Sequence, residues 1–426
     1  MTHPTSPSAP IKVGGLRSLR VQIGLLTLMQ ALLLVNNVTM IIVNGLAGFV
    51  LTDHKWLATL PVTGYVLGGA LWAMPAAAFM RRNGRRAGYT LASFAAIGGA
   101  LLAWYAMQAG SLMLLCLATF IAGFYNAFGA SLRFAAADVA DAYRPGFKAR
   151  AMSLVLTGGI MGGIIGPETA KWSRDWLPTE FSGTYLTLIG FALASMLLAQ
   201  FIRLPDGRHA PAPVGVARPL GQILAQPICW VAILCAALGY GIMNLLMVAT
   251  PLAMHAHHHD FDSAAFVIEW HVVGMFAPGL ITGALIARFG ALPIIMAGAV
   301  LMLACVAIAL AGVDLMHFLS ALFLLGVGWN FMYTGGSTLL TQAYQPIEKN
   351  KVQGFMDACV FATMISTSAS SGVLLFANGW SVINLISLPF ILIGLGAAIW
   401  LALREGRRGR RDELPVAPQP GLGPVR

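Results

Sequence analysis

The chain has 426 residues, of which 58% are hydrophobic and only 10% are charged, and its formal net charge is +10. Because soluble globular proteins contain about 25% charged residues, this composition excludes a soluble globular protein and indicates an integral membrane protein. The basic excess lies in short segments between apolar runs, which is typical of membrane-protein loops and does not indicate a nucleic-acid-binding protein.

The first 20 residues are polar and basic, and they form a predicted N-terminal tail. The apolar run that follows is too long for the apolar region of a cleavable signal peptide, so we expect it to remain as a spanning helix. The five cysteines all fall within apolar segments and show no C-x-x-C spacing. We expect them to be free thiols that pack as small hydrophobic side chains.

Twelve segments of the chain meet the requirement of about 20 mostly apolar residues for a spanning helix. They start near Val21, Trp56, Ala87, Ser111, Ala151, Thr184, Ile223, Ser263, Ala291, His317, Val352 and Val382. In the fifth of them, Gly158, Gly159, Gly162 and Gly163 predict close helix packing. The sequence therefore predicts an all-α integral membrane protein with twelve transmembrane helices.

The loops on one side of these segments hold most of the Lys and Arg residues. They include residues 81–86, 133–150, 203–218 and 404–411. Because cytoplasmic loops are enriched in Lys and Arg, this side is predicted to be cytoplasmic. It also holds both chain termini, so we expect both of them in the cytoplasm.

A Pro-rich and basic segment between the sixth and seventh predicted spans divides the chain into two halves. Residues 1–20 form the N-terminal tail, residues 21–203 the first half, and residues 204–222 the linker. Residues 223–403 form the second half, and residues 404–426 form the C-terminal tail. Each predicted half contains six helices.

Both halves place Gly within two residues of Arg in the short loop after their second span, at residues 82–85 and 288–290. Two six-helix halves with a matched loop and a long linker resemble the major facilitator superfamily over nearly the whole chain. The acidic residue that usually precedes this arginine is absent, because Arg81 and Ala287 occupy its place. The resemblance implies a major facilitator fold and alternating access around a site near the middle of the membrane.

Four side chains that can bind a soft metal ion form two pairs in the seventh and eighth predicted spans. Met243 with Met247, and His271 with Met275, each have the i,i+4 spacing that places both members on one helix face. Three thioethers and one imidazole favour copper, above all Cu(I). The spans are antiparallel neighbours and the pairs lie at similar depth, so we expect one site in the outer half of the membrane.

Packing is the alternative explanation for these residues. Methionine commonly fills gaps in apolar cores, and the chain contains 20 of them. An imidazole inside a spanning segment is rare and usually functional. His271 is therefore the residue that most favours a metal site.

M-x-x-x-M in the seventh span together with H-x-x-x-M in the eighth resembles the CcoA-type copper importers of the major facilitator superfamily. The resemblance implies that the four residues bind copper, as transported substrate and not as a cofactor. It implies import across the bacterial inner membrane for assembly of haem–copper oxidases of the cbb3 type. The expected partners are the lipid bilayer, a periplasmic copper donor and a cytoplasmic copper acceptor, and the protein is expected to be a monomer.

The predicted outer loop between the seventh and eighth spans contains Met254, His255, His257, His258 and His259. Because His-rich segments can bind metal ions, this loop is a candidate capture region above the site. An ordinary solvated loop is the alternative.

Glu269 and Asp357 are acidic residues within the eighth and eleventh predicted spans. Such residues are costly in a membrane and commonly belong to a transport pathway, so both are candidates for proton coupling. A hydrogen bond or an ion pair to a neighbouring helix is the alternative for Glu269. An acid near the positive end of a helix is the alternative for Asp357.

No nucleotide-binding loop, no metalloprotease or hydrolase motif and no long soluble segment is present, so the sequence does not predict an enzyme. Two other functions compete with copper import. One is transport of a small organic solute such as a metabolite, vitamin or drug, which a cavity lined by aromatic residues would favour. The other is a membrane copper sensor or metallochaperone, against which the complete two-half repeat argues.

Overall fold

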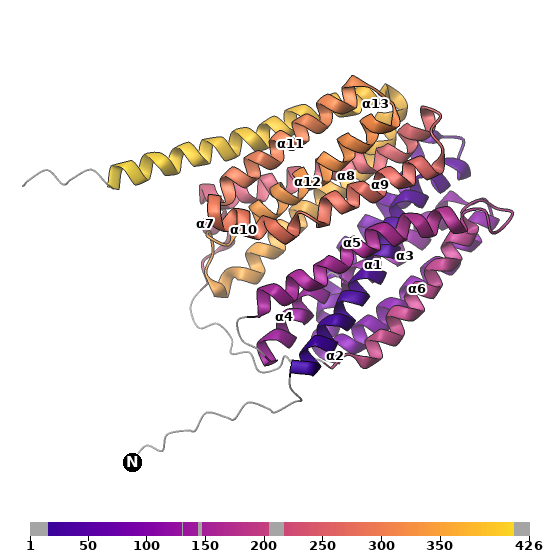
Figure 1. The fold of residues 1–426 in the computed structure, drawn as a ribbon, viewed down its shortest axis with the longest axis horizontal. Helices are drawn as coiled ribbons and strands as arrows, with labels where there is room; N and C mark the ends of the chain where they lie inside the picture. The colour runs from indigo at the N-terminus through magenta and orange to yellow at the C-terminus, as the bar shows by residue number, and fades with distance from the viewer. Residues whose placement is uncertain (1–15, 130, 144–146, 204–216, 413–426) are drawn as a thin grey trace, which may run out of the picture.

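The computed structural model describes residues 16–129, 131–143, 147–203 and 217–412, and every regular element in these ranges is a helix (Figure 1). The predicted N-terminal tail up to residue 15, the linker residues 204–216 and the C-terminal tail from residue 413 lie outside the described residues. The five cysteines, all within these ranges, are free thiols.

The helices follow the chain in two sets. The first half contains α1 (Leu16–Leu51), η1 (Lys55–Leu57), α2 (Leu60–Gln108), α3 (Leu112–Gly129), α4 (Leu132–Tyr143), α5 (Lys148–Ser173) and α6 (Ser182–Phe201). The second half contains α7 (Leu220–Leu224), α8 (Pro227–Ala256), α9 (Phe261–Phe276), α10 (Gly279–Phe289), α11 (Ala291–Ala311), α12 (Leu315–Leu340), η3 (Pro346–Glu348) and α13 (Lys349–Asp412).

Ten helical stretches in the described ranges are long and apolar enough to cross a membrane. Two of them, Lys55–Gln108 with 54 residues and Pro346–Glu405 with 60, are far longer than the roughly 20 residues that one crossing needs. Each is interrupted by a glycine with positive φ, Gly84 (φ 83°) and Gly379 (φ 82°), a conformation that other residues rarely adopt. Each therefore forms two consecutive spans, which confirms the all-helical fold class predicted from the sequence.

The two sets of helices form two bundles that lie side by side (Figure 1). They contact each other through α5 with α9 and through α2 with α13. A Cβ atom at Gly163 of α5 would lie only 2.6 Å from Cγ1 of Val272 in α9, so this glycine permits the close approach of the two bundles. The backbone N–H of Gly372 in α13 donates a hydrogen bond to Oγ1 of Thr59, with a donor–acceptor distance of 3.2 Å.

We name the two ends of the molecule by the elements they carry, the η1 end and the α7 end. At the η1 end the ring of Phe49 in α1 lies 5.3 Å from the ring of His255 in α8 and 5.8 Å from Phe376 in α13. The start of α1, the helix α4 and the helix α10 lie at the α7 end (Figure 1). The halves are thus joined by side-chain contacts at the η1 end.

An ion pair follows the break at Gly84. One Nη atom of Arg85 lies 2.6 Å from Oδ2 of Asp138 in α4. The acidic partner that the loop itself lacks thus comes from another helix of the same half. In the second half the matching Arg288 lies instead over the ring of Phe289, 5.1 Å from its centroid.

Candidate functional site

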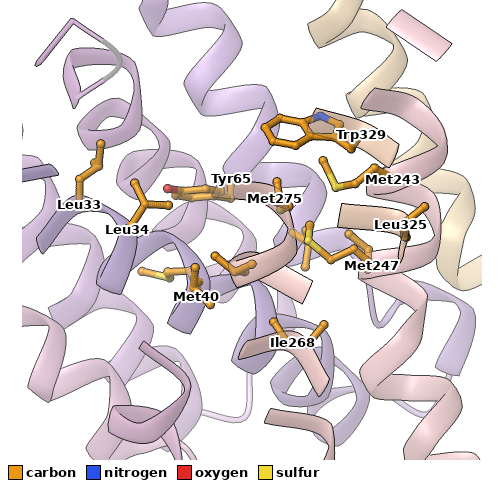
Figure 2. Packing of buried hydrophobic residues seen from close by; sticks show 14 of the residues in the cluster. Leu33, Leu34, Met40, Tyr65, Met243, Met247, Ile268, Met275, Leu325 and Trp329 are labelled. Atoms are coloured by element: carbon orange, nitrogen blue, oxygen red, sulfur yellow. The ribbon is translucent and has the colours of Figure 1, made fainter. Parts of the chain in front are cut away.

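The three methionines of the candidate copper site are buried in one contiguous hydrophobic cluster. Met243 and Met247 of α8 are 1% and 5% exposed, and Met275 of α9 is 7% exposed. Figure 2 shows their side chains in the same part of the core, with Met275 between Tyr65 of the first half and the two methionines of α8. The structure thus brings the thioethers of two helices to one region.

His271 is fully buried and is held by a helix other than the one that carries Met243 and Met247. Its Nδ1 lies 2.6 Å from the carbonyl oxygen of Leu322 in α12. A carbonyl can only accept a hydrogen bond, so Nδ1 carries the hydrogen and Nε2 presents a lone pair. That Nε2 atom is buried and has no hydrogen-bond partner.

Four aromatic side chains, which we call the aromatic group, meet where α8, α9 and α12 pack together. The rings of Trp329 and Tyr333 in α12 are stacked with an interplanar angle of 8° and a centroid distance of 5.5 Å. Tyr240 of α8 lies 5.2 Å from each of them, almost perpendicular to both. Phe276 of α9 lies 6.2 Å from Trp329.

The aromatic group belongs to the same hydrophobic cluster as the methionines, with Trp329 inside it and the other three rings packed against it. Trp329 lies beside Met243 in the view of Figure 2. Trp329 is 7% exposed, and its Nε1 donor is buried without a hydrogen-bond partner. Tyr240 and Tyr333 are partly exposed. The aromatic group was not among the residues predicted from the sequence, although the i,i+4 spacing of Trp329 and Tyr333 was a signal for a shared aromatic face.

The candidate capture loop does not gather all its members in one place. His255, His258 and His259 line a pocket of about 750 Å³ at the η1 end, together with residues of the first half. His257 lies outside the set that lines this pocket and faces Phe318 of α12, at 6.4 Å between ring centroids. Met254 is completely buried. Metal capture by this loop stays a prediction.

Polar residues of both halves also contribute to this pocket at the η1 end. Arg174 and Glu180 of the first half line it beside Asp260, the residue that precedes α9. Hydrogen bonds from the side chain and backbone of Ser263 hold the pKa of Asp260 below its ordinary value. Asp260 is therefore ionised at neutral pH and caps the start of α9.

The two candidate proton-coupling acids lie on different helices of the second half. Glu269 is partly exposed on α9, and Asp357 is exposed on α13. Their role in proton coupling stays a prediction.

Within the described ranges, no group of three or more His, Cys, Asp or Glu side chains is placed to hold a metal ion. A metal site in the core would therefore depend on the soft thioethers of Met243, Met247 and Met275 together with Nε2 of His271. Such donors accept Cu(I) and do not suit Mg²⁺ or Ca²⁺.

Two bacterial transporters are similar to this chain over most of their length. The riboflavin transporter RfnT of Brucella anthropi is 38% identical over 396 residues, which are 92% of this chain and 98% of that protein. The uncharacterized MFS-type transporter YddS of Bacillus subtilis is 28% identical over 364 residues, which are 81% of this chain and 82% of that protein.

Solved structures support the fold. A crystal structure of a bacterial homologue of the human lysosomal transporter Spinster, in an inward-facing and occupied conformation, has a TM-score of 0.63 at 18% identity. The match covers 90% of this chain and 96% of that one. The unoccupied inward-facing structure of the homologue has a TM-score of 0.64 at 14% identity and covers 90% and 97%.

These findings confirm the resemblance to copper importers only as far as the superfamily. The family model described as Major Facilitator Superfamily matches residues 24–277 and 232–423, which together extend over nearly the whole chain. The protein is accordingly a secondary transporter and not an enzyme. The chain belongs to the major facilitator superfamily.

Proposed function

We propose that this transporter moves a small, flat organic solute of the vitamin class, and that riboflavin is the first solute to test. The support from relatives is the riboflavin transporter that matches this chain over 98% of its own length. Copper import, which the sequence favoured, becomes the second candidate. The proposed location is the bacterial inner membrane.

The observation that carries the proposal is the aromatic group. Trp329 and Tyr333 present parallel rings, and Tyr240 stands perpendicular to both. Aromatic rings attract one another in offset-stacked and edge-to-face arrangements. The aromatic group therefore suits a flat conjugated ring such as that of riboflavin. Small-molecule sites are mostly lined by apolar and aromatic side chains with a few polar groups.

The contacts between the halves are consistent with alternating access. The halves meet at the η1 end through Phe49, His255 and Phe376. Helices α4 and α10, which carry Arg133 and Arg288, lie at the α7 end (Figure 1), and the positive-inside rule assigns a basic end to the cytoplasm. We therefore interpret the described conformation as closed toward the outside, with transport by rocking of one half against the other.

The direct test is uptake of radiolabelled riboflavin by bacterial cells that lack both riboflavin synthesis and their own uptake system. We expect saturable uptake by the wild-type protein. Replacement of one stacking partner, Trp329→Leu, should reduce uptake about two- to tenfold, since an aromatic pair contributes roughly 0.5–1.5 kcal/mol.

The matched control is Trp230→Leu. Trp230 is 39% exposed on α8 and packs against Trp400, with 5.4 Å between ring centroids. Its loss should leave uptake near the wild-type value. Background uptake by correctly inserted wild-type protein would contradict the proposal.

A specific observation keeps copper as the second candidate. Nε2 of the fully buried His271 has a lone pair and no partner, and its Nδ1 is held by the carbonyl of Leu322. A metal-binding histidine commonly donates its other ring N–H to a carbonyl or carboxylate, which fixes its orientation. The thioethers of Met243 and Met275 would complete a soft donor set.

Uptake of radioactive copper in the same cells tests this candidate. If copper is the substrate, Met243→Leu and Met275→Leu should reduce copper uptake to background. The control Met302→Leu, at a fully buried methionine of α11, should not reduce it. Copper uptake equal to that of empty cells, together with riboflavin uptake that survives Met243→Leu, would return the methionines to a packing role.

A further inference from the structure

A groove of about 590 Å³ lies between α1 and α5, and we call it the α1–α5 groove. Six of its lining residues belong to α1, from Leu19 to Leu28, and four lie in or directly before α5, from Phe147 to Met161. Both helices are candidate membrane spans. The start of α1 and the helix α4, which precedes α5, lie at the α7 end (Figure 1). From Leu19 to Leu28 helix α1 rises about 14 Å, about half of the roughly 30 Å hydrocarbon thickness of a membrane.

The α1–α5 groove offers a ligand mainly hydrocarbon. Leu154 and Met161 line it and are exposed. Two threonines also line it, but Oγ1 of Thr27 donates a hydrogen bond to the carbonyl oxygen of Ile23 at 2.8 Å. Oγ1 of Thr157 donates in the same way to the carbonyl oxygen of Leu154 at 2.6 Å. A hydroxyl has a single hydrogen to donate, so neither threonine has a donor left for a polar ligand.

Two glycines shape the groove. A Cβ atom at Gly158 of α5 would lie only 2.3 Å from the carbonyl oxygen of Thr27, so this glycine permits the close contact of α5 with α1. Gly24 of α1 lines the groove, is exposed, and has no atom within 4 Å of the place where its Cβ would lie. The space beside Gly24 is therefore open to a ligand.

Positive charge gathers at the end of the groove that is nearest the α7 end. Arg20 lines the groove one residue after its first α1 residue, and its side chain is exposed. Arg150 of α5 is also exposed and stands four residues before Leu154, which places both on one face of α5. The guanidinium group matches the geometry of phosphate oxygens and binds them with charge-assisted hydrogen bonds.

We propose that the α1–α5 groove binds an anionic phospholipid of the leaflet at the α7 end. One acyl chain lies along the apolar walls, and the phosphate lies at Arg20 and Arg150. An anionic lipid is favoured over a zwitterionic one because the latter brings an ammonium group close to two guanidinium groups. The aromatic group is on α8, α9 and α12, so this lipid site is separate from it and does not depend on which solute is transported.

The experiment offers two lipids to the purified full-length protein in detergent. Phosphatidylglycerol and phosphatidylethanolamine with the same acyl chains are added in equal amounts, and native mass spectrometry counts and identifies the lipids that stay bound. We expect a tightly bound lipid that is phosphatidylglycerol in about fivefold excess, as for an anionic group at a basic site on a membrane surface.

Two variants test the two parts of the site independently. Arg20→Gln should lower the preference for phosphatidylglycerol to about twofold or less. Gly24→Leu places a side chain in the open space and should remove the tightly bound lipid of either kind. Leucine favours a helix more than glycine does, so this variant is expected to fold.

Each variant has a matched control. Gly190→Leu changes an exposed glycine of α6 that also has no atom within 4 Å of its added Cβ, and it should keep the bound lipid. Arg288→Gln removes an exposed arginine of α10 at the same end of the molecule and should keep the preference. Equal binding of the two lipids by the wild-type protein would overturn the proposal. So would a tightly bound lipid that persists in Gly24→Leu, or a preference that Arg20→Gln leaves unchanged.

Discussion

At the scale of single residues, a buried carboxylate fixes the point where the linker reaches the second half. Glu348 has no exposed side-chain surface and binds Arg218 in a bidentate manner, with N–O distances of 2.8 and 2.7 Å. It also accepts hydrogen bonds from the backbone N–H groups of Arg218 and Gln345, each at 2.9 Å. Bidentate, charge-assisted pairs of this kind are among the stronger polar contacts in proteins.

We predict that Glu348→Gln lowers the melting temperature of the purified transporter in detergent by several degrees, because removal of one partner leaves the other incompletely paired. Lys351→Met is the control. Its ammonium donates one hydrogen bond to the carbonyl oxygen of Arg218 at 2.9 Å from an exposed position. A melting temperature of Glu348→Gln that equals the control would show that the pair contributes nothing to stability.

The sequence predicted some features of the candidate site and not others. The i,i+4 spacing of Met243 and Met247 was readable from local sequence, and the structure buries both residues in the core. The hydrogen bond between His271 and Leu322 joins residues 51 positions apart, so no local pattern could predict it. Tyr240 meets Trp329 only because α8 packs against α12.

At the scale of helices, glycine and proline explain which helix boundaries could be predicted from the sequence and which could not. Gly84, Gly290 and Gly379 have almost the same backbone conformation, with φ between 82° and 89° and ψ between 159° and 174°. Residues other than glycine are strained there. The first two lie in short basic loops, whereas Gly379 stands beside no charge, although the sequence placed the start of the twelfth span just after it, near Val382.

The seventh span shows how one residue can shift a predicted boundary. The sequence placed its start near Ile223, but Ile223 belongs to the short helix α7, and α8 starts at Pro227. Proline suits the first turn of a helix, and the residue before it is driven to an extended conformation. Gln226 has this conformation, with φ −74° and ψ 126°. The Gln226-Pro227 pair in the sequence was therefore a signal for the start of α8 at Pro227.

At the scale of the whole molecule, the glycines of α5 join two interfaces. Added Cβ atoms at Gly158 and Gly162 would lie 2.3 and 2.4 Å from atoms of Thr27 and Leu34 in α1. The neighbouring Gly163 faces Val272 of the other half. Close packing was expected from the sequence. The division of these glycines between two partner helices was not expected. Lipid is as apolar as the helices, and small residues do not specify which neighbouring helix they contact.

The contact between α5 and α9 permits a test of alternating access that does not depend on the identity of the solute. A Cβ atom at Gly163 would lie 3.2 Å from Cβ of Val272, close to the roughly 3.5–4.5 Å of a disulfide. We predict that the double variant Gly163→Cys with Val272→Cys forms this bond under oxidation and holds the halves in the described conformation.

Because rocking requires the halves to separate at this contact, oxidation of the double variant should reduce solute uptake to background, and reduction with dithiothreitol should restore it. The solute is the one that the wild-type protein takes up, riboflavin or copper. Each single cysteine variant, treated with the same oxidant, serves as the control and should keep its uptake. Complete cross-linking with undiminished uptake would mean that α5 and α9 stay together during transport, and the rocking mechanism would then be wrong for this protein.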